Sequence, residues 1–282
     1  MIIFKINAAV HDFIIKKKKT GITTGLVPTM GALHNGHLAL LNKARLENEL
    51  VVCSLFINPT QFNDPGDFER YPVTIENDIY LLEKAGCDVL FIPAVKEIYP
   101  GGFNLLQHYD LGYLETILEG KFRPGHFQGV CQVVHRLLDI ILPDKIYLGQ
   151  KDLQQCMVIK KMVELQKIKT EIVICATQRE PDGLAMSSRN LRLSEAGRAK
   201  APAIYAMLKT IKNELVAGNV ENIKLKAFNT LTEKGFKVDY VEIADAASLE
   251  LVREWNGKKP LAILAAAFID AIRLIDNIVI DE

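Results

Sequence analysis

The sequence has no surplus of either charge, because its 282 residues include 34 Lys and Arg against 34 Asp and Glu. Proteins that bind nucleic acid through the phosphate backbone usually carry a basic surplus, so we expect no nucleic-acid partner. The lysine run at 16–19 is the local exception. Because no arginine or aromatic cluster accompanies it, we interpret it as a solvated turn or helix end.

Cysteine is scarce and follows no pattern. No Cys-x-x-Cys motif occurs, and the five cysteines are scattered at Cys53, Cys87, Cys131, Cys156 and Cys175. An odd number without a pairing pattern argues against a disulfide framework. It indicates free, mostly buried thiols in a reducing compartment.

The chain also lacks a long uninterrupted apolar run. Its longest apolar stretch, 261–280, contains Asp270, Arg273 and Asp276, and three charges would be costly inside a membrane. We expect two buried strands and a turn there. The N-terminal stretch lacks the basic, apolar and small-residue order of a secretory signal, so we expect a cytoplasmic protein with no membrane partner.

Strand and helix patterns alternate through the first two thirds of the chain. The continuous apolar run at 50–57 is typical of a strand covered on both faces. A strand is expected to end at 25–28, and others to lie at 89–92, 146–148 and 171–176; helices are expected at about 37–48, 74–85 and 130–141. Repeated strand–helix–strand units predict an α/β fold with a parallel, doubly wound, Rossmann-type sheet.

The pattern changes after Thr177. A polar stretch leads to a helix expected at 194–215, with Ser194 as N-cap. A second helix is expected at about 220–234, and short strands at 238–243, 261–268 and 272–275. We therefore predict a Rossmann-type domain at 1–177 and a smaller α+β domain at 178–282.

Two glycines and two histidines follow the first of these strands. In a parallel sheet such a turn lies at the carboxyl edge, where nucleotides bind against a helix N-terminus. Gly31 and Gly36 let the backbone approach phosphate closely. His34 and His37 can donate hydrogen bonds to phosphate and can carry positive charge. The alternatives are two turn histidines or a zinc pair, and zinc is disfavoured because no further ligand lies nearby at the usual spacing.

The segment from His34 to His37 resembles the His-x-Gly-His signature of the nucleotidyltransferase superfamily, which includes class I aminoacyl-tRNA synthetases. The surrounding PTMGALHNGHLALL is similar to one family in particular, the pantothenate synthetases (pantoate–β-alanine ligases). Four further segments agree with that family in order and spacing, at 56–62, 123–130, 148–155 and 182–190. The resemblance covers the chain from about 25 to 190.

Two of these segments suit an acid substrate. Gln61 directly follows a buried strand, and its neutral amide can both donate and accept, which fits a ligand with hydroxyls and a carboxylate. Alone, Gln61 would be interpreted as a solvated loop residue. Gln155 falls on the same face as Asp152 if a helix begins there, so we assign Gln61, Gln155 and Asn58 to the acid.

Two other segments suit a triphosphate. Lys151 follows a strand and is expected to neutralise the β- or γ-phosphate, with Asp152 orienting that lysine or the ribose; the alternative is an exposed turn lysine. The hydroxyls and guanidinium of 187–189 make a phosphate clamp, or else an N-cap serine cluster. This stretch resembles the Lys-Met-Ser-Lys-Ser loop but has no lysine, so Lys151 and Arg189 would share that charge.

The resemblance implies an ATP-dependent ligase. Pantoate would attack ATP to give pantoyl adenylate and pyrophosphate, and β-alanine would then displace AMP to give pantothenate, a precursor of coenzyme A. It also implies Mg²⁺ as a cofactor and a homodimer. The catalytic residues carried over are His34, His37, Lys151, Ser187, Ser188 and Arg189. The nucleotide-binding residues carried over are Pro28, Thr29, Met30, Gly31, Ala32, Leu33, His34, Asn35, Gly36, His37, Gly149, Gln150, Lys151, Asp152, Gln178, Met186, Ser187, Ser188 and Arg189.

Three positions depart from the family pattern. Glutamate is frequent where Gln150 stands, and an apolar residue, often valine, where Gln178 stands; backbone contacts would tolerate both changes. In the family that the sequence resembles, magnesium binding is associated with an acidic pair near the position of Asp78. Here Asn77 precedes it, so Asp78 remains as the candidate metal ligand.

Two other functions compete with a ligase. A nucleotidyltransferase that moves AMP or CMP onto a phosphate ester shares the His-x-Gly-His motif but needs a basic acceptor pocket, and Gln61 and Gln155 are neutral. A non-catalytic nucleotide sensor would bind ATP without turnover, and the presence of Lys151 and Arg189 argues against it.

Overall fold

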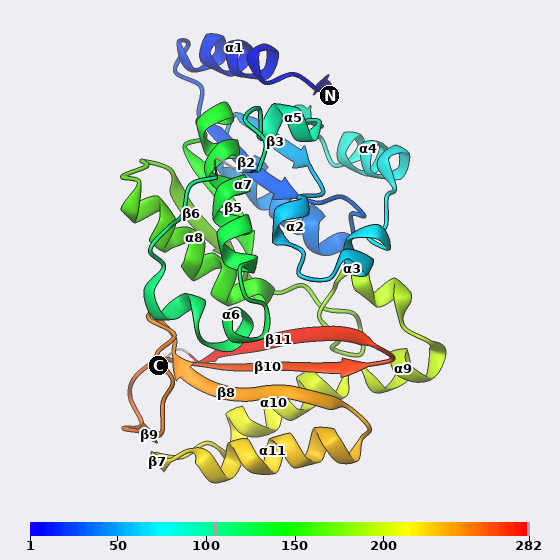
Figure 1. Ribbon diagram of the computed structural model, residues 1–282, viewed down its shortest axis with the longest axis vertical. Coiled ribbons are helices and arrows are strands. Elements are labelled where there is room, and N and C mark those ends of the chain that lie inside the picture. Colours follow the sequence, from blue (N-terminus) through cyan, green and yellow to red (C-terminus); the bar gives the residue numbers. More distant parts are fainter. Residues whose placement is uncertain (104–105, 281–282) are drawn as a thin grey trace. The chain divides into compact units, whose positions relative to one another are not determined.

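The computed structural model describes residues 1–103 and 106–280. The chain forms two compact units, which are described separately below (Figure 1). Unit 1 comprises Met1–Gly149 and Gln155–Ala176, and unit 2 comprises Gln150–Gln154 and Thr177–Glu282. The predicted division into domains at 1–177 and 178–282 stays a prediction.

Unit 1 is built on a six-stranded sheet in which every neighbouring pair is parallel. Its strands are β1 (Ile2–Phe4), β2 (Thr24–Thr29), β3 (Leu50–Leu55), β4 (Val89–Phe91), β5 (Lys145–Gly149) and β6 (Glu171–Cys175). The order β1-β4-β3-β2-β5-β6 places the topological switch between β2 and β5, where ligands of such sheets bind. The predicted doubly wound parallel sheet is confirmed.

Helices connect these strands. They are α1 (Asn7–Lys18), α2 (Asn35–Glu47), α3 (Pro65–Glu69), α4 (Ile75–Lys84), α5 (Val95–Ile98), α6 (Leu118–Phe122), α7 (His126–Ile141) and α8 (Leu153–Leu165), with 3₁₀ turns η1 (Pro59–Gln61) and η2 (Gly112–Glu115). The 3₁₀ turn η3 (Gln150–Asp152), between β5 and α8, belongs to unit 2. Helix α2 packs on β2 and β5, and α7 packs on β2 and η1. The predicted helix at 130–141 is confirmed but begins earlier, at His126.

The strands at the centre of the sheet form the core of unit 1. All six residues of β3 are buried, as are five of the six in β2, so the prediction of a strand covered on both faces is confirmed. Strand β1 and helix α1 were not predicted. The lysine run forms the last turn of α1, where positive charge favours the C-terminal end of the helix dipole.

Unit 2 contains an antiparallel three-stranded sheet of order β11-β10-β8. Its strands are β8 (Lys237–Asp245), β10 (Leu261–Ile269) and β11 (Ile272–Ile280), and a separate pair joins β7 (Gly218–Asn219) to β9 (Glu254–Trp255). The apolar stretch 261–280 is thus a hairpin of two strands, as predicted. In the part of the chain that the structure describes, no helix has the length and apolar character needed to cross a membrane.

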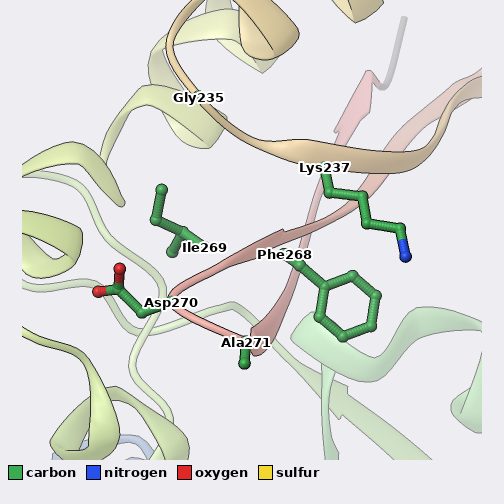
Figure 2. Close-up of a pocket in the computed structure, with 6 residues that line it drawn as sticks. All are labelled: Gly235, Lys237, Phe268, Ile269, Asp270 and Ala271. Carbon is green, nitrogen blue, oxygen red and sulfur yellow. The ribbon is translucent and has the colours of Figure 1, made fainter.

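The hairpin reverses at Asp270 and Ala271, whose φ angles are 51° and 59°. This turn lines an open cavity of about 440 Å³ together with Lys237 and Phe268 (Figure 2). The carboxylate of Asp270 accepts hydrogen bonds from the backbone N–H and the hydroxyl of Ser194. Asp270 therefore holds Ser194, the residue that directly precedes helix α9 (Glu195–Lys200).

The helices of unit 2 are α9 (Glu195–Lys200), α10 (Ala203–Glu214) and α11 (Glu221–Glu233), preceded by the 3₁₀ turn η4 (Ser188–Arg192). The single helix predicted at 194–215 is wrong, because Pro202 separates α9 from α10. Proline has no N–H to donate and collides with the preceding turn. The predicted N-cap is confirmed, since Ser194 Oγ accepts from Gly197 N at 3.0 Å.

All five cysteines are free, and four of them are buried. Burial raises the pKa of the Cys87 thiol to about 11. The prediction of free, mostly buried thiols is confirmed.

Candidate active site

The turn that carries the two histidines is held by one carboxylate. Gly31 and Ala32 both have left-handed φ angles, 86° and 49°. Asp78 of α4 is 1% exposed. It accepts hydrogen bonds from Ala32 N at 3.0 Å and from Leu33 N at 2.8 Å, one on each oxygen. The hydroxyl of Thr74 also donates to this carboxylate, at 3.1 Å. These bonds fix the path of the backbone between β2 and α2.

The two imidazoles lie at the N-terminus of α2, with ring centroids 4.1 Å apart. His34 is the N-cap of the helix, and its Nδ1 accepts from Gly36 N at 3.1 Å. His37 Nδ1 accepts from His34 N at 3.3 Å. A neutral imidazole that accepts at Nδ1 carries its proton on Nε2. Both rings therefore have an Nε2–H donor at the positive end of the helix dipole.

The other predicted nucleotide-binding residues of this segment are distributed along the same path. Two lie at the end of β2, one in the turn after it and two in the first turn of α2, in the order Pro28, Thr29, Met30, Asn35 and Gly36. The structure brings Met30 to the acid segment, because Gln61 Nε2 lies 3.2 Å from Met30 Sδ.

The acid segment follows β3 and is organised by Asn58, whose side chain is 1% exposed. Asn58 Nδ2 donates to Gln61 Oε1 at 3.1 Å and to Gly129 O at 3.0 Å. Asn58 Oδ1 accepts from the hydroxyl of Tyr99 at 2.7 Å. The Asn58 amide is thus bonded on both sides within the protein, and it holds the side chain of Gln61 through the bond to Oε1.

Gln155 lies half-buried in the first turn of α8. This helix follows β5, the neighbour of β2, whereas Gln61 follows β3 on the other side of β2. Because the carboxyl ends of adjacent parallel strands meet at one edge of a sheet, both glutamines belong to the edge that bears the histidines. A shared contact with one substrate stays a prediction.

Unit 2 carries the predicted triphosphate residues. Lys151 Nζ lies 3.1 Å from Asp152 Oδ2, which is the contact expected if Asp152 orients that lysine; a contact of Asp152 with the ribose stays a prediction. The turn that bears them follows Gly149, the last residue of β5. Asn277 of β11 donates to the carbonyls of Gln150 and Lys151, at 2.9 and 3.0 Å.

The predicted phosphate clamp at 187–189 follows a short antiparallel hairpin, in which Arg179 pairs with Ala185. Met186 N donates to Gln178 O at 2.9 Å, which joins two predicted nucleotide-binding residues. Ser187 is the N-cap of η4, and its Oγ accepts from Arg189 N at 3.3 Å. Ser188 is buried. The N-cap alternative is therefore observed for Ser187, and phosphate contacts of this stretch stay a prediction.

A buried ion pair next to this hairpin was missed by the sequence analysis. Arg179 Nη1 and Nη2 lie 2.6 and 3.0 Å from the two oxygens of Asp276, which is 4% exposed. The guanidinium also stacks on Tyr205, 3.7 Å from the ring centroid. Burial raises the pKa of the Asp276 carboxyl, and the Arg179 guanidinium opposes that rise. The sequence does contain one sign of this ion pair: Asp276 and Asn277 are polar residues inside an otherwise apolar strand.

The residues present fit a protein-bound Mg²⁺ poorly. Asp78 is almost fully buried and uses both oxygens on the backbone of the histidine turn, whereas Mg²⁺ keeps several waters and prefers substrate phosphates. Within residues 1–103 and 106–280 no group of three or more His, Cys, Asp or Glu could hold a metal ion. The predicted contact between Asp78 and Mg²⁺ stays a prediction.

Comparisons with known proteins agree on one family. The family model described as pantoate-beta-alanine ligase matches residues 2–279. A pantothenate synthetase of Cytophaga hutchinsonii is 44% identical over 270 residues, which is 95% of each chain. One from Porphyromonas gingivalis is 42% identical over 281 residues, 99% of each chain.

Solved structures give the same result. A crystal structure of pantothenate synthetase from Thermus thermophilus superposes with a TM-score of 0.88 at 39% identity and covers 99% of both chains. Pantoate-beta-alanine ligase from Francisella tularensis, complexed with beta-gamma ATP and beta-alanine, superposes with a TM-score of 0.83 at 40% identity, over 99% of this chain and 97% of that one. With this fold and this histidine turn, the chain belongs to the pantoate–β-alanine ligase family.

Proposed function

We propose that this enzyme condenses pantoate with β-alanine to pantothenate at the expense of ATP. The pantoate carboxylate attacks the α-phosphorus of ATP, which forms pantoyl adenylate and releases pyrophosphate. The β-alanine amine then attacks the acyl carbon and releases AMP. The Francisella tularensis relative, complexed with beta-gamma ATP and beta-alanine, supports two of these substrates.

The first step requires charge stabilisation and no general base, because a carboxylate is already ionised at neutral pH. We assign the stabilisation of the α-phosphoryl transition state to His34 and His37. The observation that carries this assignment is their shared geometry: each Nδ1 accepts a backbone N–H, so each ring has Nε2–H as its donor. Donors fixed before the reaction stabilise developing charge most effectively.

Gln61 and Gln155 are proposed to hold pantoate. Asn58 was predicted to contact the acid as well, but it is almost fully buried and its amide is engaged on both sides. We therefore propose that Asn58 orients Gln61, and that Gln61 makes the contact with pantoate.

Lys151 and residues 187–189 are proposed to hold the departing pyrophosphate. Ammonium, guanidinium and hydroxyl groups suit its charge. Gln150, Gln178 and Met186 would contact the nucleotide through their backbones. Mg²⁺, when bound with ATP, supplies further neutralisation of the phosphates, whose oxygens are its preferred ligands.

A cytoplasmic location and a homodimer complete the proposal. The free cysteines support a reducing compartment. The homodimer rests on the family resemblance alone, and sedimentation of the purified enzyme tests it.

The proposal is tested with His37→Ala. Loss of one donor to the transition state costs about 2–4 kcal/mol, so pyrophosphate release from ATP and pantoate should fall by roughly 30- to 900-fold. His108→Ala, at an exposed position, is the matched control and should keep the parent rate. A full rate in His37→Ala would remove this role.

The same assay separates the competing functions. With ATP, pantoate and β-alanine, a ligase makes AMP and pyrophosphate. A transferase makes neither without a phosphate acceptor, and a sensor makes neither under any condition.

A further inference from the structure

The segment Arg123–Gly129 has no assignment in the proposed mechanism, although it begins α7 beside the acid segment. His126 is 5% exposed, and its Nδ1 lies 2.7 Å from the backbone oxygen of Gln61. On the other side of the ring, Nε2 lies 3.0 Å from Arg123 Nη1. Arg123 Nη2 also reaches the same Gln61 oxygen, at 3.4 Å. Both side chains therefore converge on the backbone of Gln61.

These partners determine the state of the His126 ring. A carbonyl oxygen only accepts, so Nδ1 must donate to Gln61; a guanidinium only donates, so Nε2 must accept from Arg123. One neutral tautomer satisfies both contacts. In a ring with a proton on each nitrogen, Nε2–H would point at the N–H donors of the guanidinium. The contact with Arg123 therefore favours the tautomer in which Nδ1 carries the proton and donates to Gln61 O.

The first turn of α7 also reaches the side chain of Gln61 through Asn58. Gly129 O can only accept, so the atom of Asn58 that faces it must be Nδ2. The same nitrogen then meets Gln61 Oε1, which leaves the amide nitrogen of Gln61 on the opposite side, toward Met30. A Cβ at Gly129 would stand 2.3 Å from Thr60 O, so this close approach requires glycine.

We propose that Arg123 and His126 are positioning residues that hold Gln61 so that its amide N–H faces an acceptor oxygen of the acid substrate. His126 fixes the backbone of Gln61, and Gly129 with Asn58 fixes the direction of its amide. Neither Arg123 nor His126 contacts the substrate. This inference rests on the proposed function, in which Gln61 binds pantoate.

Two substitutions at His126 separate the role of Nδ1 from that of the ring. His126→Asn places an amide nitrogen near the position of Nδ1 and can still donate to Gln61 O. His126→Gln places its amide farther out, near Nε2, and loses that bond. We expect the KM for pantoate to stay close to the parent value in His126→Asn and to rise roughly tenfold in His126→Gln. The KM for ATP should stay unchanged in both.

A double-mutant cycle with Gln61→Ala shows whether His126 acts through Gln61. If it does, His126→Gln should add little further loss in the Gln61→Ala background. Losses that multiply, a KM for ATP that rises as much as that for pantoate, or a Gln61→Ala variant with an unchanged KM for pantoate would each overturn the inference. If His126→Gln melts below the assay temperature, Arg123→Ala takes its place in the same cycle.

Failure of the proposed function would look different. In that case the parent enzyme itself would release no pyrophosphate from ATP and pantoate. An active parent whose two losses multiply would overturn only the positioning role.

Discussion

Asn277, in the last strand of the chain, holds Lys151 by its backbone: Asn277 Nδ2 lies 3.0 Å from Lys151 O. The same nitrogen donates to Gln150 O at 2.9 Å, and Gln150 Nε2 lies 3.3 Å from Asn277 Oδ1. Asn277 is 2% exposed, so these contacts are shielded from water. One buried amide therefore fixes the turn that presents the predicted pyrophosphate-binding lysine.

Asn277→Asp should weaken the binding of ATP. The carboxylate has no donor for the two carbonyls and faces them with negative charge. A lost bond of this kind costs about 1–3 kcal/mol, so we expect the KM for ATP to rise roughly 5- to 150-fold with a smaller change for pantoate. Steady-state kinetics measure this effect. Asn213→Asp, an equal charge change at an exposed position of α10, should leave both KM values as they are, and an equal rise in both variants would contradict the role of Asn277.

The ion pair between Arg179 and Asp276 should respond asymmetrically to substitution. Asp276→Leu leaves the largely buried Arg179 guanidinium without its ionic partner, and breaking a buried pair costs about 3–5 kcal/mol. Replacing both residues removes both charges, so Arg179→Met with Asp276→Leu should be more stable than Asp276→Leu alone. Urea unfolding followed by circular dichroism tests the order. If the double variant were less stable than Asp276→Leu alone, the expected order would be wrong, and Arg179 would stabilise the fold even without Asp276.

Asp78→Asn distinguishes a positioning role from a metal-binding role. The amide keeps one acceptor but turns an NH₂ group toward the second backbone N–H, so we expect a loss of about 1.5–3 kcal/mol in unfolding free energy. Pyrophosphate release should slow as the histidine turn loosens. Raising the Mg²⁺ concentration should not restore the rate. Restoration by Mg²⁺, with unchanged stability, would instead support the metal contact.

The parts of the site that were predicted from sequence are local in the chain. Gly31, His34 and His37 lie close together in the chain, so the short backbone between them keeps them near one another. Asn58 and Gln61, both assigned to the acid, are likewise close in the chain and lie at the two ends of one 3₁₀ turn. These residues could be predicted to lie together because only a short length of backbone separates them.

The contacts that orient the site could not be predicted, because they join distant segments. His126 meets Gln61 across 65 positions, and Asn277 meets Lys151 across 126. Only the packing of α7 on η1, or of β11 on the 150–152 turn, makes such pairs neighbours. A polar residue in an otherwise apolar strand, such as Asn277, indicates that it has a hydrogen-bonding partner, but the sequence does not say which residue that is.

The fold shows a similar division. The long apolar strands were predicted from their composition, whereas β1 has three residues at the edge of the sheet and gives little periodic signal. The split between α9 and α10 had a visible cause in Pro202, because a proline in a helix interior removes a hydrogen bond.

The stability of the protein should depend on pH through Glu47. Lys43, Lys145 and Tyr147 donate to its carboxylate and lower its pKa from 4.5 to about 2. A folded-state pKa below the unfolded value stabilises the fold above pH 4.5, and this contribution is lost as the pH falls from 4.5 toward 2. The difference in unfolding free energy between the parent and Glu47→Gln should therefore be largest near neutral pH and shrink below pH 4.5. Urea unfolding at several pH values measures it, with Glu83→Gln at an exposed position of α4 as the control. A parent–variant difference that is constant from neutral pH to pH 2 would show that the three donors do not act on the charged form of Glu47.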